Sequence, residues 1–428
     1  MYLNSVYLGN KMQGLTAASQ YYFNTAPEQL TDWQILQLLA TLSNPSGSNP
    51  FKMISNDIAD SFSKKFNVPI EKTEAISGEE INSRINKFNE FINTDSYFEP
   101  GSFGLSNTNS AELTIDKDLT DKLREILKRN IEAIKDKNTT NGAIVAIATK
   151  NNELISIVGS PDPNFDFNGY KINMAIKPRP IGSTIKPFIY LKGFEKKLRP
   201  YTLVDDKEYK YTINDGFAFY PKNYDYKYRG RVDLHNALSN SLNVPTVRVL
   251  DYIGINNFNN FLTRTLELIP QQDINTYQLG IALGGLEMDL LSLSYYFTIF
   301  PNHGYLRPLQ FYKNSNNFNF TASTNFLQNK KISDEKYIEL VNKILTDRVT
   351  GIEQFGIKSN LNLLSDNYAV KTGTSREYHD SWTIGYTPDF LVGVWVGNNE
   401  DKPMDNVSGV AGAGKIWQEA MNLLLNSE

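Results

Sequence analysis

The spacing of apolar residues is helical just after residue 116 and becomes strand-like from residue 142. Six apolar residues recur every three or four positions in the first stretch: Leu119, Leu123, Ile126, Leu127, Ile131 and Ile134. With Asp116 directly ahead of them, they predict an amphipathic helix that Asp116 caps. The apolar runs 142–148 and 154–158 flank the polar segment 150–153. This arrangement is typical of a β-hairpin.

Later apolar segments predict the rest of the core. Residues 290–300 are apolar on most sides, which predicts a central helix. We expect residues 368–375 and 389–397 to be paired buried strands, and residues 407–425 to be a glycine-rich turn followed by a helix. A helix, a hairpin, further helices and late strands give an α+β order rather than a regular βαβ alternation.

The first 110 residues have a weaker pattern. Residues 1–51 predict helices, the second of which begins at Thr31 or Asp32, and residues 79–92 fit another helix. Residues 98–110 contain the Pro, Gly, Ser and Asn that are typical of a linker. We therefore expect a domain boundary near Ser110.

Composition narrows the classes of function. The 428 residues carry a net charge of −4 without a basic stripe, which argues against nucleic acid as a partner. The absence of cysteine excludes disulfides and thiolate chemistry, and three scattered histidines do not suggest a metal site. Because no apolar run is long enough to span a bilayer and no signal peptide opens the chain, we expect the polypeptide as written to be soluble.

Ser183 and Lys186 are the first candidate catalytic residues. Pro and Gly precede them and an apolar run follows, as in a turn that leads into a helix. A serine hydroxyl becomes nucleophilic when a base removes its proton, and a lysine amine is such a base when burial or a nearby cation lowers its pKa. The helix start also offers free backbone N–H groups, including that of Ser183, to an oxyanion.

Ser-x-x-Lys alone is a weak pattern, because it occurs three times in this chain. Ser61 lies in a charged stretch that is typical of a solvated surface. Ser333 precedes an amphipathic run, so we expect it to be a helix N-cap. Ser183 therefore needs support from other motifs.

Two further motifs supply that support. Lys371-Thr372-Gly373 occurs once, in a strand-like segment where the glycine allows close approach of a ligand or another backbone. Ser241-Leu242-Asn243 lies in a loop between helical segments. Ser-x-x-Lys, Ser-x-Asn and Lys-Thr-Gly in this order match the signature of penicillin-binding proteins and class A β-lactamases. Ser365 also begins a Ser-x-Asn triplet, but it stands so close to Lys371 that it predicts the turn into that strand.

The surroundings resemble the transpeptidase domain of class A penicillin-binding proteins over almost all of residues 111–428, and the last stretch is most similar to the penicillin-binding protein 1C subgroup. Five blocks carry the resemblance: Asn236-Ala237-Leu238, 282–287, Asn302-His303-Gly304, Asp380-Ser381-Trp382 and 393–397. Ile181 departs from the proline that is usual before the Gly-Ser pair. The implied fold is α+β, with an antiparallel sheet flanked by helices and a helical subdomain.

The N-terminal part resembles the closing segment of the lysozyme-like glycosyltransferase domain of the same proteins. Residues 2–9, 14–23 and Asn44-Pro45-Ser46 carry this likeness. In the family the catalytic glutamates precede this segment, so the resemblance implies a remnant without glycosyltransferase activity. The expected organisation is a helical remnant over 1–55, a linker region over 56–110 and a transpeptidase domain over 111–428.

The resemblance implies a D,D-transpeptidase that acts on peptidoglycan stem peptides ending in D-Ala-D-Ala. Ser183 attacks the penultimate carbonyl and Lys186 accepts its proton. Ser241 relays a proton to the leaving D-Ala, and Asn243 holds the substrate amide and Lys186. An amine of a second stem peptide then attacks the acyl-enzyme, and β-lactams acylate the same serine.

The remaining roles concern substrate binding. Lys371 supplies positive charge that keeps Lys186 neutral, and with Thr372 and Thr374 it binds the substrate carboxylate. The backbone N–H of Thr374 joins that of Ser183 at the oxyanion. Gly373 and Trp382 complete the substrate site, Trp382 by shaping it. The resemblance implies no metal or cofactor, a location at the outer face of the cytoplasmic membrane in the cell envelope, and an anchored full-length form.

Three alternatives remain open at this stage. A serine β-lactamase or a D,D-carboxypeptidase uses the same triplet but hydrolyses its acyl-enzyme. A β-lactamase also needs a positioned carboxylate and water, and we assign no glutamate between Asn243 and Lys371 to that role. The third alternative is a non-catalytic penicillin-binding module of the envelope.

Overall fold

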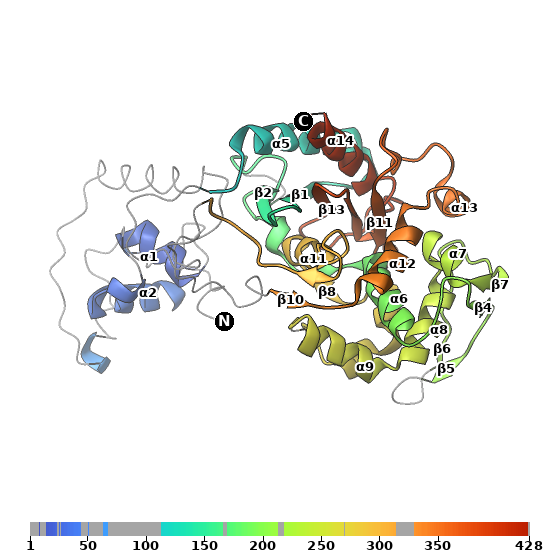
Figure 1. The fold of residues 1–428 in the computed structure, drawn as a ribbon. Helices are drawn as coiled ribbons and strands as arrows, with labels where there is room; N and C mark the ends of the chain where they lie inside the picture. The colour runs from blue at the N-terminus through green and yellow to red at the C-terminus, as the bar shows by residue number, and fades with distance from the viewer. Residues whose placement is uncertain are drawn as a thin grey trace. The chain divides into compact units, whose positions relative to one another are not determined.

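The computed structural model describes residues 8, 14–23, 25, 27–43, 50, 63–66, 113–165, 169–212, 218–268, 270–313 and 329–426. The chain divides into two compact units (Figure 1). The first unit consists of Met1–Asn107 and Asn319–Thr321, and the second of Thr108–Phe318 and Ala322–Glu428.

The first unit contains the helices α1 (Leu15–Phe23) and α2 (Asp32–Ser43). Tyr22 is fully buried in a small apolar cluster, and its hydroxyl donates to the carbonyl of Leu8 over 2.8 Å. Before α2, the hydroxyl of Thr31 accepts from the Gln34 N–H while the Gln34 side chain accepts from the Thr31 N–H. This reciprocal pair is a capping box, which confirms the predicted start of α2. The predicted helix 79–92 and linker 98–110 lie outside the described residues.

A five-stranded antiparallel sheet forms the centre of the second unit, with strand order β11-β12-β13-β1-β2. The strands are β1 (Asn141–Ala148), β2 (Glu153–Val158), β11 (Ala369–Thr374), β12 (Asp380–Tyr386) and β13 (Phe390–Gly397). The β1–β2 hairpin confirms the sequence prediction. The predicted direct pairing of 368–375 with 389–397 is wrong, because β12 lies between those strands and pairs with both. The three strands β11, β12 and β13 follow one another in the chain, and antiparallel neighbours can be joined by short turns, so β12 lies between the other two.

One face of the sheet is covered by α5 (Lys117–Ala133) and α14 (Ala413–Leu425), as Figure 1 shows. Asp116 caps α5 as predicted, since its carboxylate accepts from the N–H of Leu119 over 2.9 Å. Leu127 of α5 and Trp417 of α14 are fully buried against apolar strand residues. This face is therefore a mostly apolar core, in which the hydroxyls of Thr120 and Ser156 pair with each other over 2.8 Å.

The other face packs against α11 (Leu290–Phe297), and α12 (Glu335–Thr346) lies against β11 and α6 (Lys186–Glu195). The prediction that Ser333 is the N-cap of α12 is wrong, because Asp334 holds that position. The Ser333 hydroxyl donates to Glu195 instead. A helical region follows α6, with α7 (Leu234–Ser239), α8 (Asn243–Ile253), α9 (Ile255–Asn260) and α10 (Ile274–Tyr277).

The remaining elements are short. They are η2 (Pro27–Gln29), η4 (Lys135–Lys137), η5 (Met174–Ile176), β3 (Arg179–Pro180), η6 (Gly182–Ile185), β4 (Leu203–Asp206), β5 (Tyr211–Thr212), β6 (Ala218–Phe219), β7 (Gly230–Asp233), η8 (Phe261–Thr265), η9 (Gln278–Leu283), β8 (Glu287–Met288), β9 (Tyr305–Leu306), β10 (Lys330–Lys331), α13 (Ile352–Phe355) and η12 (Arg376–Tyr378). Among the described residues, no helix combines the length and the apolar character that crossing a bilayer requires.

Candidate active site

Ser183 lies in the 3₁₀ turn η6, which leads directly into α6. Gly182 has a left-handed φ of 56°, and a Cβ there would stand 2.6 Å from the backbone nitrogen of Thr374. Only glycine fits this close approach, which brings the Ser183 turn against the end of β11. Ser183 is half-buried between two buried residues, and no described residue hydrogen-bonds its hydroxyl. The hydroxyl is thus available to a substrate.

Lys186 is the first residue of α6 and is completely buried. Its Nζ lies 2.7 Å from the Oδ1 of Asn243, 2.6 Å from the carbonyl of Ser241, 3.2 Å from the carbonyl of Leu242 and 3.4 Å from the Ser241 hydroxyl. The loop between α7 and α8 therefore surrounds this amine. Ser241 reaches the position through a left-handed φ of 54°, which turns the loop toward α6.

The environment of Lys186 favours the neutral amine. Burial lowers its pKa well below the ordinary value, and the nearby Lys371 lowers this pKa further. A neutral amine has two N–H donors and one lone pair, so it can keep the two shortest bonds and still accept a proton. Among the described residues, no carboxylate forms an ion pair with Lys186. This is the state that a general base requires.

Lys371 lies in the middle of β11 and is 3% exposed. Its Nζ is 2.8 Å from the hydroxyl of Ser241 and 2.7 Å from the carbonyl of Thr372. Burial, and secondarily the cation of Arg348, lower the pKa of Lys371 to about 7. The Ser241 hydroxyl thus lies between the amines of Lys186 and Lys371.

Thr372, Gly373 and Thr374 follow Lys371 on β11 and lie near the Ser183 turn or the loop at Gly409. A Cβ at Gly373 would stand 2.5 Å from the carbonyl of Ile181, so this glycine permits the contact with the Ser183 turn. Thr372 is buried, and the Thr374 hydroxyl accepts from the N–H of Gly409. An accepting hydroxyl retains its own proton for a ligand.

Trp382 lies beneath the Ser183 turn. It is 1% exposed, and its indole N–H donates to the carbonyl of Pro180 over 2.9 Å. This placement favours the shaping role that the sequence suggested. The other part of the prediction, that Trp382 belongs to the substrate site, stays a prediction.

Arg179 and Asp380 form a buried ion pair beside the Ser183 turn. The sequence motifs included Asp380 but did not predict a role for Arg179. The carboxylate of Asp380 is fully buried and accepts from Arg179 Nε over 2.9 Å, from the Trp395 indole over 2.9 Å and from the Ser375 hydroxyl over 2.8 Å. It ties the segment before Ser183 to the end of β11. Arg179 stands four residues before Ser183, and its proximity to the motif was the one available signal.

These groups provide what acyl transfer needs. They supply an accessible hydroxyl, a buried amine of lowered pKa, a second amine and a hydroxyl between the two amines. Among the described residues, no group of three or more His, Cys, Asp or Glu side chains could hold a metal ion.

Known proteins show the same combination of domains. The family model of the penicillin-binding protein transpeptidase domain matches residues 142–422. The chain belongs to this family. The transglycosylase family model matches residues 1–72, and the two matches in this order mark a class A penicillin-binding protein, as the sequence predicted.

Curated relatives of this family are similar along the whole chain. Penicillin-binding protein 2D of Bacillus subtilis is 24% identical over 470 residues, which cover 100% of this chain and 64% of the relative. Penicillin-binding protein 1C of Escherichia coli is 23% identical over 436 residues, which cover 100% of this chain and 53% of the relative. The chain thus spans between half and two thirds of the length of these relatives.

Solved structures of penicillin-binding proteins share the fold. The crystal structure of penicillin-binding protein 1A from Haemophilus influenzae matches with a TM-score of 0.61 at 16% identity, covering 100% of this chain and 85% of that chain. The structure of PonA1 from Mycobacterium tuberculosis in complex with penicillin V matches with a TM-score of 0.60 at 16% identity, over 86% of this chain and 90% of that chain. The transpeptidase-like fold expected from the sequence is confirmed.

Proposed function

We propose that this chain is a peptidoglycan D,D-transpeptidase that works through an acyl-enzyme on Ser183 and is acylated there by β-lactams. The observation that carries the proposal is the position of the Ser241 hydroxyl, 2.8 Å from Lys371 Nζ and 3.4 Å from Lys186 Nζ. A hydroxyl between two amines of lowered pKa is a proton relay. The transpeptidase family match supports the reaction class.

In the proposed first step, the Ser183 oxygen attacks the penultimate carbonyl of a stem peptide and its proton passes to Lys186. The backbone N–H groups of Ser183 and Thr374 bind the oxyanion. When the tetrahedral intermediate collapses, Ser241 delivers a proton to the leaving D-Ala amine and is reprotonated from the lysines. The amine of a second stem peptide then attacks the ester and forms the cross-link, while the proton it loses passes through Lys186 to the released Ser183 oxygen.

Substrate binding is assigned to the neighbouring groups. Lys371, Thr372 and Thr374 bind the terminal carboxylate, while Gly373 keeps β11 close enough to the serine turn. The Asn243 amide holds the substrate amide and Lys186 together. We place the domain boundary near residue 110 and the site at the outer face of the cytoplasmic membrane. The expected loss of glycosyl transfer concerns residues that are described only in part, and it stays a prediction.

Labelling with a fluorescent penicillin tests the proposal. We expect a persistent covalent adduct, which peptide mapping by mass spectrometry assigns to Ser183 and which Ser183→Ala abolishes. Rapid release of hydrolysed penicillin would instead identify a β-lactamase, and release of free D-Ala from stem peptides without cross-links would identify a carboxypeptidase. A folded wild-type protein that reacts with neither penicillin nor stem peptide would favour the alternative that the chain is a non-catalytic module.

A further inference from the structure

The Ser241-Leu242-Asn243 loop is held by residues that lie about twenty positions earlier in the chain. Leu242 is the N-cap residue of α8, and its side chain makes no capping hydrogen bond. The first N–H groups of a helix need acceptors from outside the helix. Here the Oδ1 of Asn223 accepts from the N–H of Asn243 over 2.8 Å and from that of Val244 over 3.2 Å.

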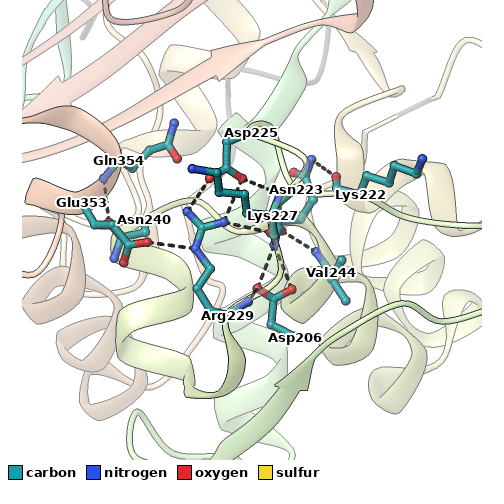
Figure 2. Close-up of polar contacts among 11 residues, drawn as sticks. Asp206, Lys222, Asn223, Asp225, Lys227, Arg229, Asn240, Val244, Glu353 and Gln354 are labelled. Carbon is teal, nitrogen blue, oxygen red and sulfur yellow. Dashed lines mark hydrogen bonds and ion pairs between the residues drawn. The ribbon is translucent and has the colours of Figure 1, made fainter.

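Asn223 is itself fixed on its other side. It is 2% exposed, and its Nδ2 lies 2.8 Å from each carboxylate oxygen of Asp206 and 2.8 Å from the carbonyl of Lys227. Asp206 is fully buried and also accepts from the N–H of Arg229 over 2.9 Å. Figure 2 shows Asn223 between Asp206 on one side and Val244 on the other. Because the donors and acceptors on each side are of fixed type, the Asn223 amide has a single orientation.

The residue next to Asn223 fixes the side chain of Asn243. The carbonyl of Lys222, which is labelled in Figure 2, accepts from the Nδ2 of Asn243 over 2.8 Å. The Oδ1 of Asn243 then points to Lys186, 2.7 Å from its Nζ. The backbone and the side chain of Asn243 are therefore both set by residues 222–223.

We propose that Asn223, oriented by the buried carboxylate of Asp206, is a positioning residue that holds Asn243 and the Ser241 hydroxyl against Lys186. This inference rests on the proposed function and deepens it. Asn223 touches no reacting atom and acts through α8. Its loss lets the start of α8 move, and Asn243 then no longer presents its oxygen to the buried amine. The protonation of that amine changes, since a hydrogen-bond acceptor favours the charged form.

The test begins with Asn223→Ala, measured by the rate of penicillin acylation across pH and by amide hydrogen exchange of the peptide around 241–247. We expect faster exchange at the start of α8 and a loss of about ten- to hundred-fold in the acylation rate, as for a displaced catalytic group. We also expect the acidic limb of the acylation pH profile to move. Asn152→Ala is the matched control. Asn152 is equally buried, and its Nδ2 donates to the carbonyls of Arg307 and Pro308. Its replacement should therefore lower stability without changing the pH profile.

A charge exchange keeps the test decisive if Asn223→Ala does not fold. Asn223→Asp places a second carboxylate against Asp206 and should reduce acylation strongly. The double variant Asp206→Asn with Asn223→Asp again places a donor against an acceptor between these two residues, although the Lys227 carbonyl loses its donor. We expect it to recover acylation by about ten-fold over Asn223→Asp, because the two substitutions act as a coupled pair.

The outcomes separate this inference from the proposed function. Faster exchange with an unchanged pH profile and acylation rate would reduce Asn223 to a structural role and overturn the inference. A double variant that folds but is no more active than Asn223→Asp would overturn it as well. A wild type that forms no adduct would contradict the proposed function. Independently, amide exchange at 241–247 that is as slow in Asn223→Ala as in the wild type would contradict the positioning role.

Discussion

The two faces of the five-stranded sheet both bury apolar residues, but at β11 they differ in chemistry. On one face, Val370 of β11 packs in an apolar cluster with Trp417 and Leu127. On the other, the next residue of the same strand, Lys371, lies with Lys186 among carbonyls, hydroxyls and an amide. Among the described residues, neither lysine forms an ion pair.

The difference separates stability from reactivity. Burial of apolar side chains contributes about 25 cal/mol per Å², so the apolar face stabilises the fold. A buried ammonium without a counter-ion costs free energy, and it relieves that cost by losing its proton. The second face therefore carries amines of lowered pKa at the expense of stability, which is common at active sites.

The largest expected effect belongs to the reactive face. Ser183→Ala should lower the rate of penicillin acylation by more than about a thousand-fold, as for other serine nucleophiles. The free energy of unfolding should change by less than about 0.5 kcal/mol, because Ser183 is half-exposed and its hydroxyl has no described partner. Gel fluorescence of the adduct and thermal unfolding measure the two quantities. A large loss of stability would show that the two faces are not separable.

Leu127→Ala makes the opposite test on the apolar face. Leu127 is fully buried between α5 and the sheet, so its truncation should cost about 2–5 kcal/mol of unfolding free energy. The acylation rate of the folded protein should stay within about two-fold of the wild type, since distant sites act independently. Urea unfolding and single-turnover acylation are the measurements. A parallel loss of acylation would contradict the comparison.

Lys371→Met tests the cost of the buried amine through its pH dependence. The pKa of Lys371 is about 7 in the folded chain and the ordinary lysine value when unfolded. Between these values the unfolded chain binds more protons, so wild-type stability rises with pH. Relative to Lys371→Met, the wild type should gain up to about 1.4 kcal/mol per pH unit from pH 7 to 10. Identical slopes in denaturant titrations of both proteins would refute the lowered pKa.

The smallest effect concerns Arg348, whose guanidinium lies over the ring of Phe355 at 5.5 Å. Its charge lowers the pKa of Lys371, after burial. Arg348→Met should therefore raise that pKa and move the basic limb of the acylation pH profile upward by about half a pH unit, as expected for one partly screened charge. Arg129→Met on α5 is the control and should leave the profile in place. A downward movement for Arg348→Met would have the wrong sign.

The sequence predicted the parts of the fold that depend on local pattern. The cap of Asp116, the β1–β2 hairpin and the start of α2 near Thr31 are all set by residues within a few positions of each other. The three motifs were found because each is short and their order is fixed. The predicted pairing of the two late strands failed, since strand order in a sheet depends on partners that are not visible in either segment.

What the chain alone determined is the chemical inventory, namely two serines, two lysines and an amide in a fixed order, together with the elements that carry them. Tertiary structure decided which of these groups meet and which others support them. Asn223, Asp206, Arg179 and Arg348 are ordinary polar residues in the sequence. They gain a role only after folding removes water around them, because hydrogen bonds and charges become strong and directional in a buried site.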